Sequence, residues 1–159
     1  MGVTFVERSQ AVLRSFMAGA QREHFPQRTL RRVGLALGHR RIAIVGAPGH
    51  SAPIQERLTG ARDALAAAGV APVDIRIGPV HSFEACRDLV LAMLDAGYRP
   101  TAILGTTDIA AIGAIHACAM RGLSVPGDVS VTGFDDLPAA RYVMPQLTTV
   151  AHPYRAIAR

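Results

Sequence analysis

Two aspartates and a threonine follow apolar runs in the second half of the 159-residue chain, at positions where they could bind a polar ligand. Thr107 and Asp108 come shortly after the run 101–104, and Asp135 follows the run 129–133. In an open parallel α/β sheet, ligands bind in the crevice outside the carboxyl ends of the strands. If both runs are strands of such a sheet, Thr107, Asp108 and Asp135 lie at the mouth of one crevice.

These side chains suit a ligand that carries hydroxyl groups. A carboxylate that follows a buried strand is rarely left without partners, so Asp135 could accept two hydroxyl protons from a polyol or a sugar. The pattern predicts that Asp108 is the N-cap of a helix over 108–120, which leaves the Thr107 hydroxyl facing the crevice as donor and acceptor. The alternative for Asp135 is an exposed carboxylate in a turn, a role that also suits Asp136.

Arg57 adds a guanidinium to the same edge, because it lies near the start of the helical pattern that follows the apolar run 42–45. There it could bind a ligand hydroxyl or carboxylate through its planar fork of N–H donors. Taken alone, an arginine in this position is more often a surface residue. The edge that it shares with Thr107 and Asp135 supports the functional interpretation.

Alternating apolar runs and helical patterns predict the fold that positions these residues. The predicted strands cover 42–45, 73–77, 101–104 and 129–133, with 147–150 as a fifth extended piece. The predicted helices begin near Pro53, at Ser82 and at Asp108, and they end at Gly69, Gly97 and Gly122. Such βαβ alternation predicts an α/β fold with an open, mostly parallel sheet of four to five strands and helices on both faces.

Composition narrows the class of protein. The chain is long enough for one domain with a core, and no apolar run approaches the length of a membrane span. All 17 basic residues are arginine and the net charge is +5, but the arginines are mostly scattered and are not interleaved with aromatics, which favours an ordinary solvated surface.

Cys86 and Cys118 fall in helical patterns and are expected to be reduced and buried. The sequence lacks a secretory signal, which predicts a cytoplasmic protein.

Motifs for catalysis and metal binding are missing. The six histidines show no ligand spacing such as H-E-x-x-H, so we predict neither a metal site nor a cofactor. There is no serine in a G-x-S-x-G elbow, and nothing fixes two carboxylates on either side of a bond as glycoside hydrolysis requires. The sequence therefore favours a binding protein without enzymatic activity over an enzyme that acts on a sugar or nucleotide.

An ordered set of short motifs resembles the LacI/GalR family of bacterial transcriptional regulators. The motifs are LGHRRIA at 37–43, RLTG at 57–60, PTAI at 100–103, TDIAAIGA at 107–114, GLSVPGDVSV at 122–131, GFDD at 133–136 and PQLTTV at 145–150. Each motif is weak by itself. Their order and spacing over residues 37–153 are highly specific.

The resemblance implies a periplasmic-binding-protein-like effector domain, of which residues 37–153 look like the second lobe. It leaves 1–36 as a segment of uncertain structure and 154–159 as a short tail. Members of the family read DNA through an N-terminal helix-turn-helix, and residues 1–36 do not resemble one. The chain is thus expected to be a fragment that binds effector weakly at best and shows no specific DNA binding. By resemblance, the full-length family protein is a homodimer, with the helix 109–120 near the partner chain.

The resemblance also assigns effector contacts. It implies that Arg57, Asp135 and the position of Thr107 touch a small-molecule effector, often a sugar or a nucleoside-like compound. His152 falls where the family often has a glutamine that reaches the ligand, and Val80 falls where some members place an aromatic. Thr107 replaces a usual asparagine and His152 a usual glutamine, so the identity of the effector is open.

A sugar-binding protein of a transport system is the alternative, because it would share the fold. The missing secretory signal and the sequences of the GHRR and VPGDVSVTGFDD motifs, which are closer to those of the regulators, favour the regulator.

Overall fold

The computed structural model describes residues 38–46, 54–55, 57–59, 66, 69, 74–77 and 81–151. Its centre is a sheet of four strands, β1 (Ile42–Gly46), β2 (Asp74–Ile77), β3 (Ala102–Gly105) and β4 (Ser130–Thr132). The strands lie in the order β2-β1-β3-β4, and all three neighbouring pairs are parallel. The predicted open parallel α/β sheet is confirmed.

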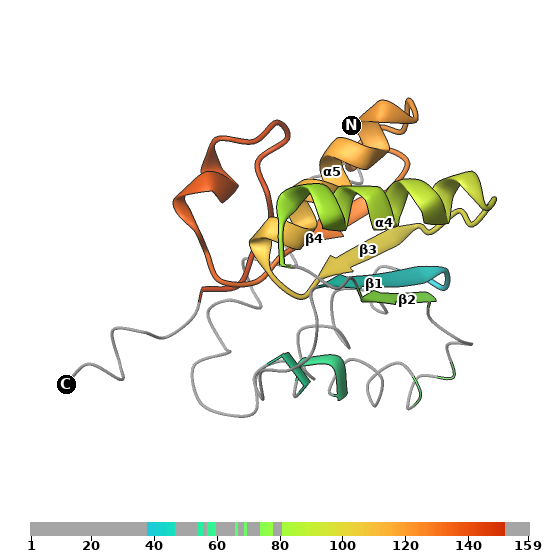
Figure 1. Ribbon diagram of the computed structural model, residues 1–159, viewed down its shortest axis with the longest axis horizontal. Coiled ribbons are helices and arrows are strands. Elements are labelled where there is room, and N and C mark those ends of the chain that lie inside the picture. The colour runs from blue at the N-terminus through green and yellow to red at the C-terminus, as the bar shows by residue number, and fades with distance from the viewer. Residues whose placement is uncertain are drawn as a thin grey trace, which may run out of the picture.

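The strand order changes direction between β1 and β3. From β1 the chain moves outward to β2, then returns to the other side of β1 to form β3 and β4 (Figure 1). Val45 and Gly105 are partners in the β1–β3 register, so the two strands end at the same level. Ligands bind in the crevice outside the carboxyl ends of the strands at such a topological switch point.

Helices cover both faces of the sheet, as the sequence predicts. α4 (Phe83–Asp95) and α5 (Asp108–Met120) pack side by side on one face (Figure 1). The helical residues 54–55 and 57–59 lie on the opposite face, where the Leu58 side chain is buried.

Local signals explain why α4 begins and ends where it does. The Ser82 hydroxyl accepts a hydrogen bond of 3.1 Å from the backbone N–H of Ala85, which satisfies one of the free donors of the first turn. At the other end Gly97 takes a φ of 87°, a left-handed conformation that glycine adopts without penalty. Both positions agree with the sequence prediction.

The core lies between the sheet and the pair α4 and α5. Its fully buried side chains include Ile103 of β3 and Val90 and Met93 of α4. The two helices approach closely at Gly113, where an added Cβ would lie 2.9 Å from the Phe83 carbonyl oxygen and from the Arg87 nitrogen. Glycine at this position is therefore what lets α5 pack directly on the backbone of α4.

Both cysteines belong to this core. Cys86 and Cys118 are buried free thiols, which confirms the prediction that they act as small apolar residues. Within the described ranges, no helix combines the length and apolarity needed to cross a membrane.

The predicted fifth strand is reduced to two isolated contacts. Thr132 forms a parallel bridge with Thr148, and Asp135 forms one with Ala151. The chain between these partners makes a short 3₁₀ helix (Pro138–Arg141) and a loop that exposes Tyr142. Segment 147–151 thus lies against the end of β4 and the turn after it, at the carboxyl edge of the sheet.

Candidate functional site

Arg57 and Asp135, which are 78 positions apart in the sequence, meet at the carboxyl edge of the sheet. The Arg57 Nη2 lies 3.4 Å from the Asp135 Oδ1, and the two side chains are only 13% and 17% exposed. Arg57 comes from the helical residues after β1, and Asp135 from the turn after β4. The structure therefore brings together two of the residues that the sequence predicts to share one crevice.

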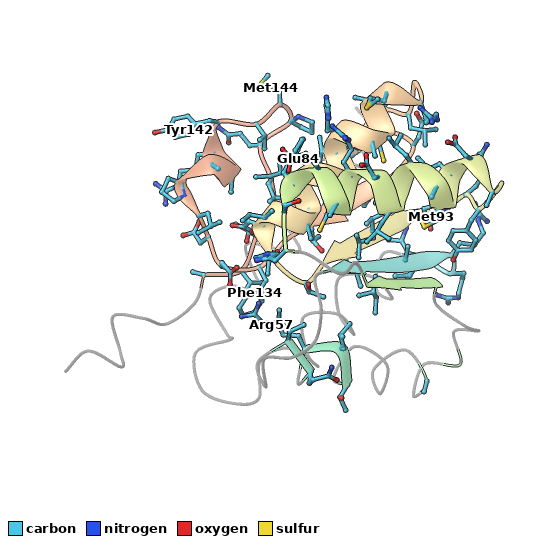
Figure 2. All side chains as sticks on the ribbon, in the orientation of Figure 1. Arg57, Glu84, Met93, Phe134, Tyr142 and Met144 are labelled. Atoms are coloured by element: carbon cyan, nitrogen blue, oxygen red, sulfur yellow. The ribbon has the colours of Figure 1, made fainter. Side chains whose placement is uncertain are left out.

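Two further contacts fix the orientation of the Arg57 guanidinium. Its Nη1 donates a hydrogen bond of 2.8 Å to the carbonyl oxygen of Thr106, just after β3. Its carbon lies 3.7 Å from the centre of the Phe134 ring, and Figure 2 shows the two labelled side chains next to each other. A guanidinium held by a carbonyl on one side and an aromatic face on another has lost most of its rotational freedom.

The turn that carries Asp135 has a strained backbone. Asp135 has a φ of 123° and Asp136 a φ of 55°, both in a region that residues other than glycine seldom adopt. Each such residue costs about 1–3 kcal/mol and persists only where the surroundings impose it. Here the Asp135 N–H donates to the Val150 carbonyl at 2.8 Å, and the Asp136 N–H donates to the Thr149 hydroxyl at 3.3 Å.

Thr107 is the N-cap of α5, so the prediction that Asp108 is the cap was wrong. The Thr107 Oγ1 accepts from the Ala110 N–H at 3.3 Å, and Thr107 has the extended backbone of a cap residue. Both residue types cap helices well, and the contacts of the Asp108 side chain with distant segments decide between them. Thr107 is buried, and its hydroxyl also contacts a neighbour that carries a titratable group.

That neighbour is His81, which the sequence reasoning missed. The His81 Nε2 lies 2.9 Å from the Thr107 Oγ1, and the imidazole is otherwise exposed. His81 immediately precedes Ser82, the N-cap of α4, and helices in this fold begin at the carboxyl edge of the sheet. The available signal was therefore its position before a predicted helix start, since a lone histidine shows no motif.

Asp108 is fully buried below the strained turn. Its Oδ2 accepts the Leu137 N–H at 2.7 Å, and its Oδ1 accepts the Thr149 hydroxyl. Its own N–H donates to the Phe134 carbonyl at 2.8 Å. Both carboxylate oxygens are thus engaged by the protein itself. Direct contact of Asp108 with an effector stays a prediction.

The two other predicted contact residues, Val80 and His152, lie outside the described residues. Within the part of the chain that is described, no three His, Cys, Asp or Glu side chains gather in a way that could hold a metal ion. What the site does offer is a carboxylate acceptor, a guanidinium donor, and a hydroxyl beside an imidazole. These groups are the kinds of donor and acceptor that suit neighbouring hydroxyl groups, which both donate and accept hydrogen bonds.

Comparison with curated proteins identifies relatives for most of the chain. The profile of the periplasmic binding protein-like domain matches residues 32–159. The HTH-type transcriptional regulator DegA of Bacillus subtilis is 38% identical over 123 residues, which cover 76% of this chain and 36% of DegA. The ribose operon repressor of Haemophilus influenzae is 36% identical over 117 residues, which cover 73% of this chain and 35% of the repressor. The chain thus spans about a third of the length of these relatives.

Solved structures give the same result. A dimeric Lac repressor with an 11-residue C-terminal deletion superposes with a TM-score of 0.79 at 32% identity, over 84% of this chain and 49% of that one. A LacI-family sugar-binding transcriptional regulator from Escherichia coli, complexed with phosphate, has a TM-score of 0.72 at 35% identity, over 82% of this chain and 48% of that one. The chain therefore belongs to the periplasmic binding protein-like domain family, and its relatives are LacI-type transcriptional regulators.

Proposed function

We propose that the described lobe senses a small polyhydroxylated effector, a sugar or a nucleoside-like compound, for a LacI-type transcriptional regulator. The relatives carry the names of transcriptional regulators, which favours this role over that of a sugar-binding protein of a transport system or of an enzyme. A regulator that acts on DNA works in the cytoplasm, which is the location we propose.

One observation carries the proposal. The partly buried Arg57–Asp135 pair lies at the topological switch point, with the His81–Thr107 pair on the neighbouring strand end. A partly buried charged pair is costly unless hydrogen-bonding partners surround it, and the hydroxyl groups of an effector are suitable partners. Effector hydroxyl groups would donate to Asp135 and accept from Arg57, and they would find a third partner at Thr107. Val80 and His152 are proposed as further contacts.

Sensing requires that effector binding changes the arrangement of a larger assembly. In proteins with two lobes, a ligand in the crevice closes the lobes around itself, and closure repositions whatever they carry. Effector affinity and DNA affinity are then linked reciprocally. In this proposal DNA is read by a helix-turn-helix of the complete regulator, and this lobe contributes its half of the effector crevice.

A homodimer is the proposed assembly, as in the structure of the dimeric Lac repressor. Met120 is an exposed apolar side chain at the end of α5, and Tyr142 and Met144, in the loop after the 3₁₀ helix, are 83% and 86% exposed. Figure 2 shows Tyr142 and Met144 projecting from the same loop. Large apolar side chains exposed together mark an interaction surface. Light scattering should show a dimer that the Tyr142→Asp/Met144→Asp variant converts to monomer, whereas Ala139→Asp, at an exposed position of the adjacent 3₁₀ helix, should not.

The effector site is tested by thermal unfolding with and without D-ribose, D-galactose, adenosine and cytidine. A probe at about 100 times its dissociation constant stabilises the folded state by about 2.7 kcal/mol. For a chain of this size that stabilisation raises the midpoint by about 5–10 °C. The increase should vanish in Asp135→Asn and persist in Asp88→Asn, which makes the same change at an exposed position of α4.

An increase that Asp135→Asn leaves intact would place the binding site elsewhere on the molecule. Failure of every probe to move the midpoint of a cooperatively unfolding chain, up to tens of millimolar, would contradict the proposal that this lobe binds these compounds.

A further inference from the structure

We propose that Asp108 is a positioning residue for Asp135: its buried carboxylate locks the turn 133–137 to the segment 147–151, and so fixes Asp135 against Arg57. This inference rests on the proposed function, because it takes Asp135 as the effector-binding carboxylate. It assigns Asp108 an indirect role in effector binding, distinct from the direct contact that the sequence suggests.

The contacts of Asp108 reach both segments. Its side chain is 0% exposed, and it accepts the Leu137 N–H at one oxygen and the Thr149 hydroxyl at the other. Its backbone N–H donates to the Phe134 carbonyl on the near side of Asp135. The turn is thus held to Asp108 immediately before Asp135 and two residues after it.

Thr149 links Asp108 to the turn through its hydroxyl group. The hydroxyl that donates to Asp108 also accepts from the Asp136 N–H at 3.3 Å. The next residue, Val150, accepts the Asp135 N–H at 2.8 Å through its carbonyl. The positive φ angles of Asp135 and Asp136 are therefore spanned by hydrogen bonds that all lead back to Asp108 or to its partner segment.

The steric fit of Gly133 supports the same conclusion. A Cβ at Gly133 would clash with the Asp108 Oδ1 and would lie 2.9 Å from the Leu147 Cδ2. The carboxylate therefore occupies the space that a side chain at position 133 would need. Asp108 is packed against the start of the turn as well as bonded to its end, and both contacts restrict the conformation of the turn.

A buried carboxylate is costly unless every oxygen is bonded, so a purely structural purpose could be served more cheaply by apolar packing. Unlike apolar packing, a carboxylate makes directional hydrogen bonds. Its two oxygens accept from two segments, the turn 133–137 and the segment 147–151. A hydrogen bond to a charged acceptor is about twice as strong as a neutral one. The strained conformation that presents Asp135 is stabilised by this anchor.

Amide hydrogen exchange in the unliganded protein tests the proposal through two variants. Thr149→Val keeps the side-chain shape and removes the hydroxyl that Asp108 holds. Asp108→Asn keeps the shape and replaces one acceptor oxygen by a donor. The readouts are the N–H groups of Asp135 and Leu137, whose own acceptors, Val150 O and Asp108 Oδ2, are unchanged in Thr149→Val.

We expect both variants to accelerate exchange at Asp135 and Leu137 by about tenfold, the factor that corresponds to one lost hydrogen bond to a charged group. The Ile103 amide of β3 should change much less, because core amides exchange through more extensive opening. The matched controls are Thr148→Val, the same change at the neighbouring residue, and Asp88→Asn on the exposed face of α4.

Uniform acceleration at all amides would show a structural role without positioning and would overturn the proposal, as would unchanged exchange at Asp135 and Leu137. Titration with D-ribose and D-galactose adds the functional arm. A probe that binds the native chain should bind Thr149→Val about tenfold more weakly and Thr148→Val equally well. If no probe binds the native chain, the proposed function fails while the exchange data still decide the role of Asp108.

Discussion

The guanidinium carbon of Arg57 lies 3.7 Å from the centre of the Phe134 ring, although the two residues are 77 positions apart in the sequence. The contact places a cation over an aromatic face at the edge of the site, where both side chains are partly shielded from solvent. It shows that Phe134 serves the site through its ring, while its backbone carbonyl is bonded to the N–H of Asp108.

Replacing Phe134 by leucine should weaken the fold and release Arg57. The cation–π contact at a partly desolvated site contributes about 1–2 kcal/mol. A double-mutant cycle with Arg57→Met, measured by denaturant unfolding, should give a coupling free energy of about that size.

Phe83 and Arg87 provide the control, since their ring and guanidinium are 6.0 Å apart on the surface of α4. The Phe83→Leu/Arg87→Met cycle should give a coupling free energy below about 0.5 kcal/mol, because 6.0 Å is at the outer limit of a cation–π contact. Equal coupling in the two cycles would contradict the special role of the Phe134 ring.

Gly113→Ala should destabilise the protein, even though alanine favours a helix by about 1 kcal/mol over glycine. The added Cβ would lie 2.9 Å from backbone atoms of Phe83 and Arg87, so α4 must shift as a whole. Overpacking of this kind costs about 1–3 kcal/mol, which outweighs the gain in helix propensity.

Gly127→Ala separates this effect from a general intolerance of alanine. Its Cβ would meet the Ser124 side chain at 3.0 Å, and that hydroxyl can rotate away. Urea unfolding should show a change within about 0.5 kcal/mol for this variant. A net gain in stability for Gly113→Ala would mean that the helices separate without cost.

Neither cysteine should react with a thiol reagent in the native protein at pH 8. Burial raises the pKa of the Cys118 thiol to about 11, so only about one molecule in a thousand carries the reactive thiolate at that pH. Burial raises the pKa of Cys86 as well. Ellman's reagent should label less than 0.1 equivalent in native buffer and both thiols in denaturant; rapid native labelling of Cys118→Ser would reveal an accessible Cys86.

The free energy of unfolding should fall as the pH drops below about 6.5, in part because of His39. Burial lowers the pKa of His39, so the unfolded chain takes up a proton at a pH where the folded chain does not. The contribution is fully present above the unfolded pKa of about 6.5 and is lost as the pH falls toward the folded value. The stability difference between the native chain and His39→Gln should shift in favour of the variant between pH 7.5 and 5.5; a constant difference would contradict this.

Repeating local signals made most of the fold predictable. The four strands and α4 were predicted within one residue or two of their observed ends, because apolar runs, Ser82 and Gly97 act through neighbours in the sequence. The fifth strand was only partly correct. Segment 147–151 has the apolar composition of a strand, but its hydrogen bonds go to a strained turn beyond β4.

The sequence predicted several of the residues that form the site, but not all of the hydrogen bonds that join them. The convergence of Arg57 and Asp135 followed from topology, since the carboxyl ends of all strands of a parallel sheet lie along one edge. The choice between Thr107 and Asp108 as cap did not, because it depends on Leu137 and Thr149, about 30 and 40 residues further along. His81 was missed for the same reason: its partner, Thr107, is 26 residues away.

Because the strained turn depends on residues near the end of the lobe, the site forms after the rest of the lobe during synthesis. The sheet and its helices are complete once residue 132 has joined β3, but the bonds that hold Asp135 and Asp136 come from Thr149 and Val150. A nascent chain that has emerged only through residue 140 can already pair its four strands, yet it has nothing to impose the two positive φ angles. Strand pairing and binding competence are therefore acquired in sequence, with about 18 residues of synthesis between them.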